Sequence, residues 1–290
     1  MAAKGGTHTM YIATLPLDDN GMATLTCYIQ EPSDELPGTT RKPAILVLPG
    51  GGYQFTSDRE AEPVALAYAA RGFQAFILRY STGPHANGLK PLAEASSAIE
   101  MIRKNAHKWG VIPNQVFTVG FSAGGHLSGW VGLCGQHKPN GMILAYPAAE
   151  LFVAGAAQQK RERHLNTLLG TGWSADDAAA LNLANQVTAD AIPMFCWSTA
   201  EDTVATPAPI LELATAYARL GRPFELHIFQ FGGHAMSLAT HTTASGDAAN
   251  VDAIVAKWVD LSVAWLQRNF GPPPLSAEPY VMPERLQGLL

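Results

Sequence analysis

The sequence predicts an α/β protein whose mostly parallel sheet of eight strands is covered by helices on both faces. Short apolar runs rich in β-branched residues alternate along the chain with longer helical patterns, as expected for a sheet built from strand–helix–strand units. Hydrophobic residues make up 47% of the 290 residues, which is enough to fill a substantial core. Because no Ser/Gly-rich or charge-rich linker interrupts residues 1–270, we expect one domain there and a C-terminal tail at 271–290.

An N-terminal hairpin is expected to precede the strand–helix units. Two extended segments, Met10–Thr14 and Ala23–Glu31, flank the turn signal Asp18-Asp19-Asn20-Gly21. Six further strands are predicted at Ala44–Leu48, Phe73–Arg79, Gln115–Val119, Met142–Tyr146, Met194–Ser198 and Phe224–Phe231. Helices are predicted at Glu60–Arg71, Pro91–Trp109, Ala123–Leu133, Pro207–Leu220 and Val251–Asn269. In sheets of this kind a ligand binds beyond the carboxyl ends of the strands.

One segment between two predicted strands is much longer than a crossover helix requires. It covers residues 148–191, where Leu165–Leu169 and Asp176–Leu183 have helical patterns and no run is typical of a strand. Connections of this length are uncommon inside a domain. Since this one follows the carboxyl end of a strand, we interpret it as a cap or lid that shapes a pocket.

The charge balance argues against two classes of partner. The net charge is −5, and the densest basic run, residues 160–163, is typical of a solvated helix face, so neither nucleic acid nor an anionic membrane is expected. Residues 1–10 lack the apolar core of a signal peptide and no apolar run approaches 18 residues, so we expect a cytoplasmic protein. Charged residues make up only 15%, against about 25% in typical domains, which is compatible with a homo-oligomer.

The cysteines and histidines indicate neither a disulfide framework nor a metal. Cys27, Cys134 and Cys196 are odd in number, widely spaced and set among apolar residues, so we expect buried thiols in a reducing compartment. No two of the nine histidines have the His-x-His or His-x-x-x-His spacing of metal ligands. No metal and no cofactor is therefore expected.

The strongest chemical signal is Gly120-Phe121-Ser122-Ala123-Gly124, between the predicted strand Gln115–Val119 and a predicted helix. A hydroxyl becomes nucleophilic when it projects into a site and a base removes its proton. A Gly-x-Ser-x-Gly pattern at a strand-to-helix turn provides that projection, because glycines there avoid collisions between neighbouring backbone segments. Ser122 is therefore the candidate nucleophile. The alternative is that the pattern marks only a tight turn.

An acid and then a histidine are expected downstream of such a serine, each in a loop that follows a strand. Asp202 follows the predicted strand Met194–Ser198, and His234 follows Phe224–Phe231 and two glycines. We predict that His234 takes the serine proton and that Asp202 orients the imidazole. Glu201 is the alternative acid.

The remaining histidines and several aromatic residues have simpler interpretations. His126 is expected to donate a structural hydrogen bond, and His227 lies within a predicted strand. Surface positions are expected for His85, His107, His137 and His164. Three aromatic residues near predicted strand ends either line the pocket or pack in the core: Tyr53, Tyr80 and Trp197.

Three consecutive glycines, Gly50-Gly51-Gly52, follow the predicted strand Ala44–Leu48 and Pro49. Glycine lets the backbone approach a substrate closely and direct N–H groups at developing negative charge. Gly51 and Gly52 are the candidate donors from this loop, and Ala123 is the candidate donor after the nucleophile. A phosphate-binding loop is the alternative, but neither Gly-Lys-Ser/Thr nor Gly-x-Gly-x-x-Gly is present.

Together these motifs resemble a known family. Pro49-Gly50-Gly51-Gly52-Tyr53, Gly120-Phe121-Ser122-Ala123-Gly124-Gly125-His126, Asp202-Thr203-Val204 and Gly232-Gly233-His234 resemble α/β-hydrolase esterases near the hormone-sensitive-lipase and acetyl-esterase group. They are most similar to small bacterial acetyl xylan or feruloyl esterases, over roughly residues 44–270. The resemblance implies the α/β-hydrolase fold, a triad and an oxyanion hole. The triad would be Ser122, Asp202 and His234, and the oxyanion hole Gly51, Gly52 and Ala123.

Three positions depart from the pattern of the wider group. Pro49 stands where many relatives carry His, a feature shared with the acetyl xylan esterase-like branch. Asp202 is followed by Thr-Val-Ala where Pro often closes the motif, and Ala235 stands where Gly is frequent.

The resemblance implies a serine carboxylesterase that acts on small-molecule esters. Short-chain acyl esters, above all acetyl groups on plant-derived saccharides, would be hydrolysed through an acyl-enzyme without a cofactor. Two alternatives remain. One is a peptidase or amidase of the same fold, and the other is a non-catalytic binding protein on a hydrolase scaffold.

Overall fold

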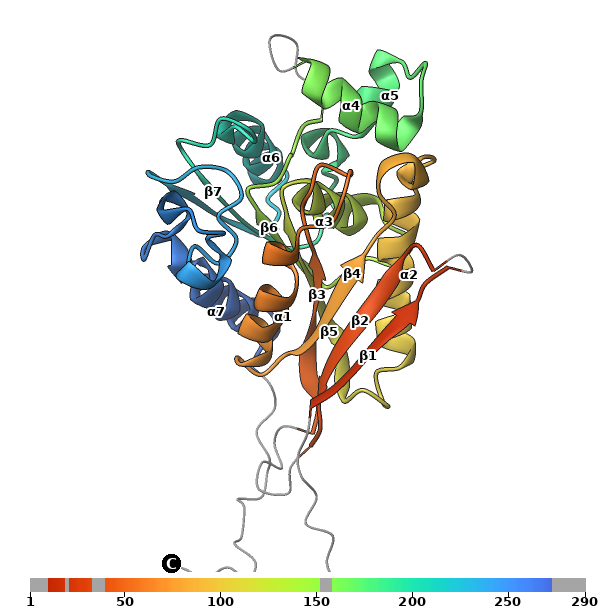
Figure 1. The fold of residues 1–290 in the computed structure, drawn as a ribbon, viewed down its shortest axis with the longest axis vertical. Helices are drawn as coiled ribbons and strands as arrows, with labels where there is room; N and C mark the ends of the chain where they lie inside the picture. Colours follow the sequence, from red (N-terminus) through yellow and green to blue (C-terminus); the bar gives the residue numbers. More distant parts are fainter. Residues whose placement is uncertain (1–9, 19–20, 33–39, 152–157, 273–290) are drawn as a thin grey trace, which may run out of the picture.

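Eight strands form one sheet, in the order β1-β2-β4-β3-β5-β6-β7-β8 (Figure 1). The computed structural model describes residues 10–18, 21–32, 40–151 and 158–272. The strands are β1 Met10–Pro16, β2 Thr24–Gln30, β3 Lys42–Leu48, β4 Gln74–Arg79, β5 Val111–Phe121, β6 Gly141–Ala145, β7 Met194–Thr199 and β8 Phe224–Phe229. β1 and β2 form the predicted hairpin and β2 pairs antiparallel with β4, whereas all pairings from β4 to β8 are parallel. The prediction of a mostly parallel sheet is confirmed.

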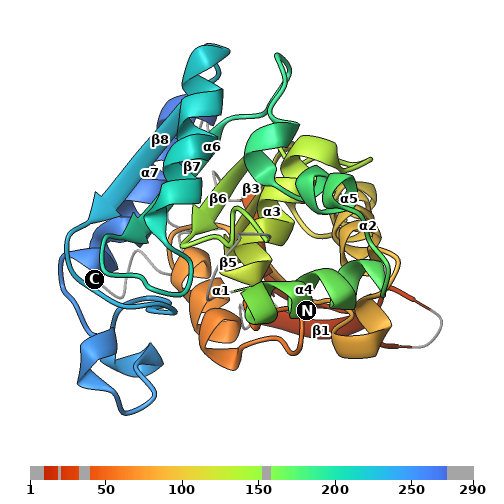
Figure 2. The same cartoon turned by 90° about the horizontal axis from the view of Figure 1, so that it is seen from above.

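Helices cover both faces of this sheet (Figures 1 and 2). α1 (Glu62–Ala69) and α7 (Trp258–Phe270) pack on one face. The other face carries α2 (Lys90–Lys104), α3 (Ala123–Cys134) and α6 (Pro207–Arg219). The insertion between β6 and β7 contains α4 (Gln158–Leu169) and α5 (Ala175–Ala180), which lie beyond one end of the sheet (Figure 1). Residues 152–157 of the expected cap and 273–290 of the expected tail are outside the described residues.

The central strand β3 shows why the sheet is buried on both faces. All seven of its residues are buried, and successive side chains point to opposite faces. Leu46 and Leu48 enter the core beneath α2 and α3, while Ile45 and Val47 enter the core beneath α1 and α7. Burying one such side chain stabilises the fold by about 1.5–3 kcal/mol. The continuous apolar run in the sequence therefore corresponds to a strand between two cores.

Several predicted helix boundaries are wrong, and at one of them local side-chain hydrogen bonds compete with the helix. The helix expected at Val251–Asn269 begins only at Trp258, since Asp252 Oδ1 accepts hydrogen bonds from the amides of Ile254 and Val255 and forms a turn instead. The helix expected to reach Trp109 ends at Lys104.

The other boundary differences are smaller. The helix expected from Glu60 begins at Glu62, because residues 58–60 form a short 3₁₀ turn. The last predicted strand ends at Phe229 instead of Phe231. In the cap, α4 extends further towards the N-terminus than the predicted Leu165–Leu169, and α5 stops at Ala180 instead of Leu183.

The expectation of buried thiols holds for two of the three cysteines. Cys27 and Cys196 are buried, whereas Cys134 is exposed because it ends α3, where the helix leaves the core. All three thiols are free. Within the described part of the chain, no helix has both the length and the apolar character needed to cross a membrane.

Candidate active site

Ser122 occupies a strained turn between β5 and α3. Its backbone has φ 51° and ψ −115°, a conformation that side-chain-bearing residues rarely adopt and that must be held by its surroundings. The neighbouring glycines allow this turn. A Cβ on Gly120 would lie 2.1 Å from the carbonyl oxygen of Gly124, and a Cβ on Gly124 would lie 2.0 Å from that of Leu48. The predicted strand–turn–helix context of the serine is therefore present.

The structure brings the three predicted residues together into one hydrogen-bonded chain. Ser122 Oγ lies 2.8 Å from His234 Nε2, and His234 Nδ1 lies 2.7 Å from Asp202 Oδ2. Ser122 follows β5, Asp202 follows β7 and His234 follows β8, so parallel strands bring the three loops to one edge of the sheet. This geometry provides a hydroxyl, a base to take its proton and a carboxylate to orient the base.

Asp202 is the carboxylate that contacts His234. Its side chain is fully buried, and Oδ1 accepts hydrogen bonds from the amides of Val204 and Ala205, both at 2.8 Å, leaving Oδ2 for the imidazole. The alternative acid, Glu201, is exposed and accepts from the amide of Gly232 at 3.1 Å. The turn that follows Asp202 thus fixes its carboxylate through two backbone amides.

The glycine loop after β3 runs beside Ser122. A Cβ on Gly50 would lie 3.1 Å from Ser122 Cβ, and Gly51 and Gly52 adopt φ values of +131° and +62°, which favour glycine. Among the hydrogen bonds of the described residues, none uses the amides of Gly51, Gly52 or Ala123. The Gly50 amide, by contrast, donates to Glu60 Oε2 at 2.8 Å. The three candidate oxyanion donors are therefore available for a ligand.

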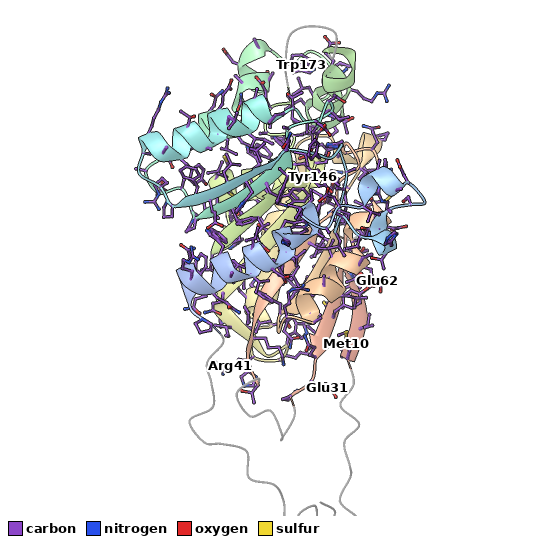
Figure 3. All side chains as sticks on the ribbon, turned by 90° about the vertical axis from the view of Figure 1, so that its left-hand side faces the viewer. Met10, Glu31, Arg41, Glu62, Tyr146 and Trp173 are labelled. Carbon is purple, nitrogen blue, oxygen red and sulfur yellow. The ribbon has the colours of Figure 1, made fainter. Side chains whose placement is uncertain are left out.

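Glu60 is a residue of the site region that the sequence reasoning missed. Its side chain is buried behind the glycine loop, where its second oxygen accepts a hydrogen bond from the Tyr146 hydroxyl at 2.6 Å. Tyr146 lies inside the molecule below the cap (Figure 3). Nothing in the local sequence separates Glu60 from Asp58, whose side chain is 92% exposed. Only the three-dimensional packing identifies the buried carboxylate.

Two histidines connect this region to the cap. His126 is fully buried, and its ring nitrogens bond to the Tyr53 hydroxyl at 2.7 Å and to the carbonyl oxygen of Leu181 at 2.8 Å, which confirms the predicted structural role. His164 was expected on the surface but is half-buried. A Cβ on Gly52 would lie 2.9 Å from His164 Nε2, so this imidazole of α4 faces the glycine loop.

The remaining expectations for single residues are mixed. His85 and His107 are exposed as expected, whereas His137 is half-buried. The three aromatic residues left open between pocket lining and packing are buried in the core: Tyr53, Tyr80 and Trp197.

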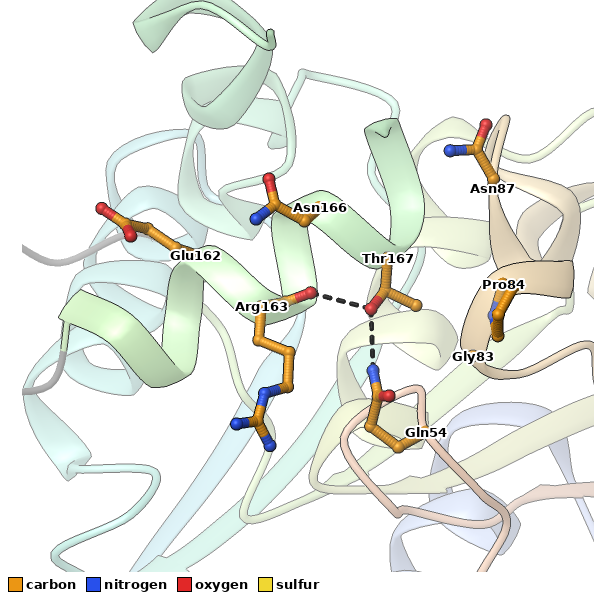
Figure 4. A pocket seen from close by; sticks show the side chains of 8 residues that line it. All are labelled: Gln54, Gly83, Pro84, Asn87, Glu162, Arg163, Asn166 and Thr167. Carbon is orange, nitrogen blue, oxygen red and sulfur yellow. Dashed lines mark hydrogen bonds between the residues drawn. The ribbon is translucent and has the colours of Figure 1, made fainter. Parts of the chain in front are cut away.

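A pocket of mixed polar and apolar character lies between Gln54, which follows the glycine loop, and α4 (Figure 4). Its volume is about 650 Å³. Gln54 Nε2 donates to Thr167 Oγ1 at 2.7 Å, which joins the loop to the cap across one side of the pocket. The lining residues are Gln54, Gly83, Pro84, Asn87, Glu162, Arg163, Asn166 and Thr167. Most of these side chains carry uncharged hydrogen-bonding groups or short apolar surfaces.

The described residues contain no group of three or more His, Cys, Asp or Glu side chains that could hold a metal ion.

Known proteins with similar sequences include an acetylxylan esterase and a xylanase. Acetylxylan esterase of Xylanibacter ruminicola is 27% identical over 238 residues, which cover 78% of this chain and 46% of that protein. Endo-1,4-beta-xylanase B of Butyrivibrio fibrisolvens is 30% identical over 224 residues, which cover 71% of this chain and 34% of that protein. The chain therefore spans less than half the length of either relative.

Solved structures show the same fold over nearly their whole length. An alpha/beta hydrolase enzyme from a Medee basin deep-sea metagenome library is 33% identical with a TM-score of 0.77, covering 90% of this chain and 98% of that one. The acetyl ester-xyloside bifunctional hydrolase of Caldicellulosiruptor lactoaceticus is 29% identical with a TM-score of 0.74, covering 90% and 97%.

The fold defines an α/β hydrolase, as the sheet and these neighbours agree. A family model, BD-FAE, matches residues 33–210, more than half of the sequence. The chain belongs to the BD-FAE family.

Proposed function

We propose that the protein is a serine carboxylesterase that hydrolyses short-chain acyl esters, acetyl esters above all. The observation that carries the proposal is the continuous hydrogen-bonded chain from Ser122 through His234 to Asp202. The names of the relatives, acetylxylan esterase and acetyl ester-xyloside bifunctional hydrolase, support a carboxylic ester hydrolase. The expected cytoplasmic location stays a prediction.

In the proposed reaction Ser122 Oγ attacks the ester carbonyl while His234 Nε2 takes its proton. Asp202 holds the other ring nitrogen and stabilises the imidazolium. The negative charge on the tetrahedral intermediate is stabilised by the amides of Ala123 and of Gly51 or Gly52, and loss of one such donor costs about 3–4 kcal/mol. His234 then protonates the leaving alcohol, and an activated water hydrolyses the acyl-enzyme by the same sequence.

The hydrogen-bonding side chains of this pocket support a saccharide as the alcohol portion of the substrate. The amide side chains of Gln54, Asn87 and Asn166 and the hydroxyl of Thr167 line it, and such groups pair with sugar hydroxyls. Gln54 lies two residues beyond the candidate oxyanion donor Gly52, so the pocket adjoins the far end of the glycine loop, and its lining residues do not include the triad. We therefore propose acetylated plant-derived saccharides as natural substrates.

The first test removes the nucleophile. Ser122→Ala is expected to abolish hydrolysis of p-nitrophenyl acetate and labelling by a fluorophosphonate probe, with an unchanged circular dichroism spectrum, because only the hydroxyl is lost. His234→Gln should have the same effect, whereas His241→Gln, at an exposed histidine seven residues further along, should not. Retained turnover in Ser122→Ala would remove the assignment. An unlabelled native protein would favour the non-catalytic alternative.

The second test concerns the alcohol portion. Asn87→Leu removes one hydrogen-bonding side chain from the pocket, so we expect KM for acetylated xylo-oligosaccharides to rise by about 2–10-fold, the effect of one lost hydrogen bond. Turnover of p-nitrophenyl acetate should stay unchanged. The matched control is Asn114→Leu, an exposed asparagine in β5 far from the pocket. Equal KM values in both variants would argue against a saccharide site here.

A comparison of substrates tests the peptidase alternative. Faster cleavage of aminoacyl anilides than of acetyl esters would favour that alternative.

A further inference from the structure

Behind the candidate catalytic residues lies a carboxylate that the reaction described above does not use. Glu60 is 3% exposed. Its Oε2 accepts a hydrogen bond from the Gly50 amide at 2.8 Å, and its Oε1 accepts one from the Tyr146 hydroxyl at 2.6 Å. Because a carboxylate can only accept, two donors fit the ionised form. Burial raises the pKa of Glu60 above its ordinary value, and the hydrogen bonds from Tyr146 and Gly50 and the nearby charges of His234 and Arg59 offset only part of that rise.

On one side, Glu60 fixes the start of the glycine loop. The Gly50 carbonyl oxygen also accepts a hydrogen bond, from the Ser57 amide at 2.9 Å, so both polar backbone groups of Gly50 are held by residues 57–60. The contact is close, because a Cβ on Gly50 would lie 2.6 Å from Glu60 Oε2 and 2.8 Å from the Phe121 carbonyl oxygen. Because Gly50 is fixed, the orientation of the next two amides, those of the candidate oxyanion donors Gly51 and Gly52, is restricted as well.

On the other side, Glu60 reaches the His234 loop through Tyr146. The Tyr146 hydroxyl accepts a hydrogen bond from the Ser237 amide at 2.9 Å while donating to Glu60. The Tyr146 ring contacts the His234 imidazole, with ring centroids 5.2 Å apart and planes at 70°. Arg59, the preceding residue, donates to the Ala235 carbonyl oxygen at 2.8 Å. Residues 59 and 60 therefore brace the loop that carries the candidate base.

We propose that Glu60 is a positioning residue, which holds the oxyanion loop on one side and the His234 loop on the other. The inference rests on the proposed function. The same carboxylate also favours the imidazolium that forms when His234 accepts the serine proton, since an opposite charge nearby stabilises a cation. The carboxylates of Asp202 and Glu60 lie near His234 and favour its protonated form, whereas the positive charge of Arg59 opposes it. The titratable Tyr146 lies between Glu60 and His234.

The central test is Glu60→Gln, assayed with p-nitrophenyl acetate. The glutamine side chain has one oxygen, which can accept a hydrogen bond from either the Gly50 amide or the Tyr146 hydroxyl. Its NH₂ group, itself a donor, then faces the other donor. We expect kcat to fall by about 10–100-fold, as for a misplaced catalytic group, with KM changed less than about threefold. The acidic limb of kcat/KM against pH should move to lower pH, because the neighbouring negative charge is gone. A merely structural carboxylate would leave that limb in place.

The chain offers a matched control two residues away. Glu62 Oε1 accepts a hydrogen bond from the Tyr28 hydroxyl at 2.7 Å, a carboxylate–tyrosine pair like that of Glu60 but remote from His234. Glu62→Gln should therefore keep the kcat and the pH profile of the native protein. Wild-type kcat and pH profile in Glu60→Gln, or an equal fall in both variants, would overturn the proposal.

A second variant separates geometry from charge and serves if Glu60→Gln fails to fold. Tyr146→Phe keeps the carboxylate and removes only the hydroxyl, so we expect kcat to fall by about 2–10-fold, with the acidic limb moved less than in Glu60→Gln. Tyr28→Phe is its control and should be neutral. A native kcat in Tyr146→Phe would overturn the link to the His234 loop. Fluorophosphonate labelling of the native protein distinguishes the two failures: without labelling the esterase proposal fails, and with labelling only the role of Glu60 does.

Discussion

At the scale of single residues, Ala235 shows what a departure from the family pattern means physically. It follows His234 and adopts φ +62°, in the left-handed region that favours glycine. Its carbonyl oxygen accepts a hydrogen bond from Arg59, which holds the backbone there. A Cβ in this region costs about 1–2 kcal/mol. A glycine at this position would adopt the same backbone conformation without that cost.

Ala235→Gly is therefore expected to stabilise the protein. Relief of the strain outweighs the greater flexibility of glycine in the unfolded chain, so the free energy of unfolding should rise by about 0.5–1 kcal/mol. Urea denaturation measures this change in the free energy of unfolding. Ala218→Gly, at an exposed position within α6, should have the opposite sign and cost about 1 kcal/mol. A loss of stability in Ala235→Gly would contradict this account.

Single residues also show where sequence reasoning reaches its limit. Ser122, Asp202 and His234 each lie in the turn or loop that follows a strand, so local patterns predicted all three. Glu60 gains its position from Tyr146, 86 residues further along the chain, and from Gly50. His164 likewise meets the glycine loop only through the packing of the cap. Contacts of this kind leave no local pattern.

At the scale of elements, α3 joins the glycine loop to the cap through His126. This side chain accepts a hydrogen bond from Tyr53, which follows the glycine loop, and donates one to the Leu181 carbonyl oxygen in the cap segment. Burial, followed by the nearby His164 charge, lowers the pKa of His126 to about 4, despite the opposing effect of the Leu181 hydrogen bond. Only the neutral ring can accept from Tyr53, so protonation would break one of the two links.

The stability of the protein should depend on pH through this histidine. The unfolded chain binds a proton near pH 6.5 and the folded one only near pH 4, so stability rises with pH between these values. The contribution is complete above about pH 6.5 and is lost as pH falls to about 4, amounting to about 3 kcal/mol. Denaturant unfolding at both pH values should show this loss in the native protein and in the control His107→Gln. In His126→Gln the loss should shrink by that amount, and an unchanged loss would refute the link.

At the scale of the whole molecule, the alternation of apolar runs and helical patterns predicted the layered architecture but not the order of the strands. Continuous apolar runs such as β3 require cover on both faces, which determines the class of fold. The position of β4 between β2 and β3 depends on pairings between distant segments. Helix ends were the least predictable, because side chains such as Asp252 stop or delay a helix through local bonds.

The position of His234 after the last strand has a consequence for biosynthesis. A ribosome releases the N-terminal part of a chain first. The segment that carries the imidazole leaves the exit tunnel after β1–β8, and the carbonyl oxygen of Ser237 in it accepts a hydrogen bond from the indole of Trp258, which emerges later still. A nascent polypeptide can thus form its first seven strands while lacking a proton acceptor. The Ser122 hydroxyl therefore leaves the ribosome 112 residues ahead of the imidazole that would take its proton.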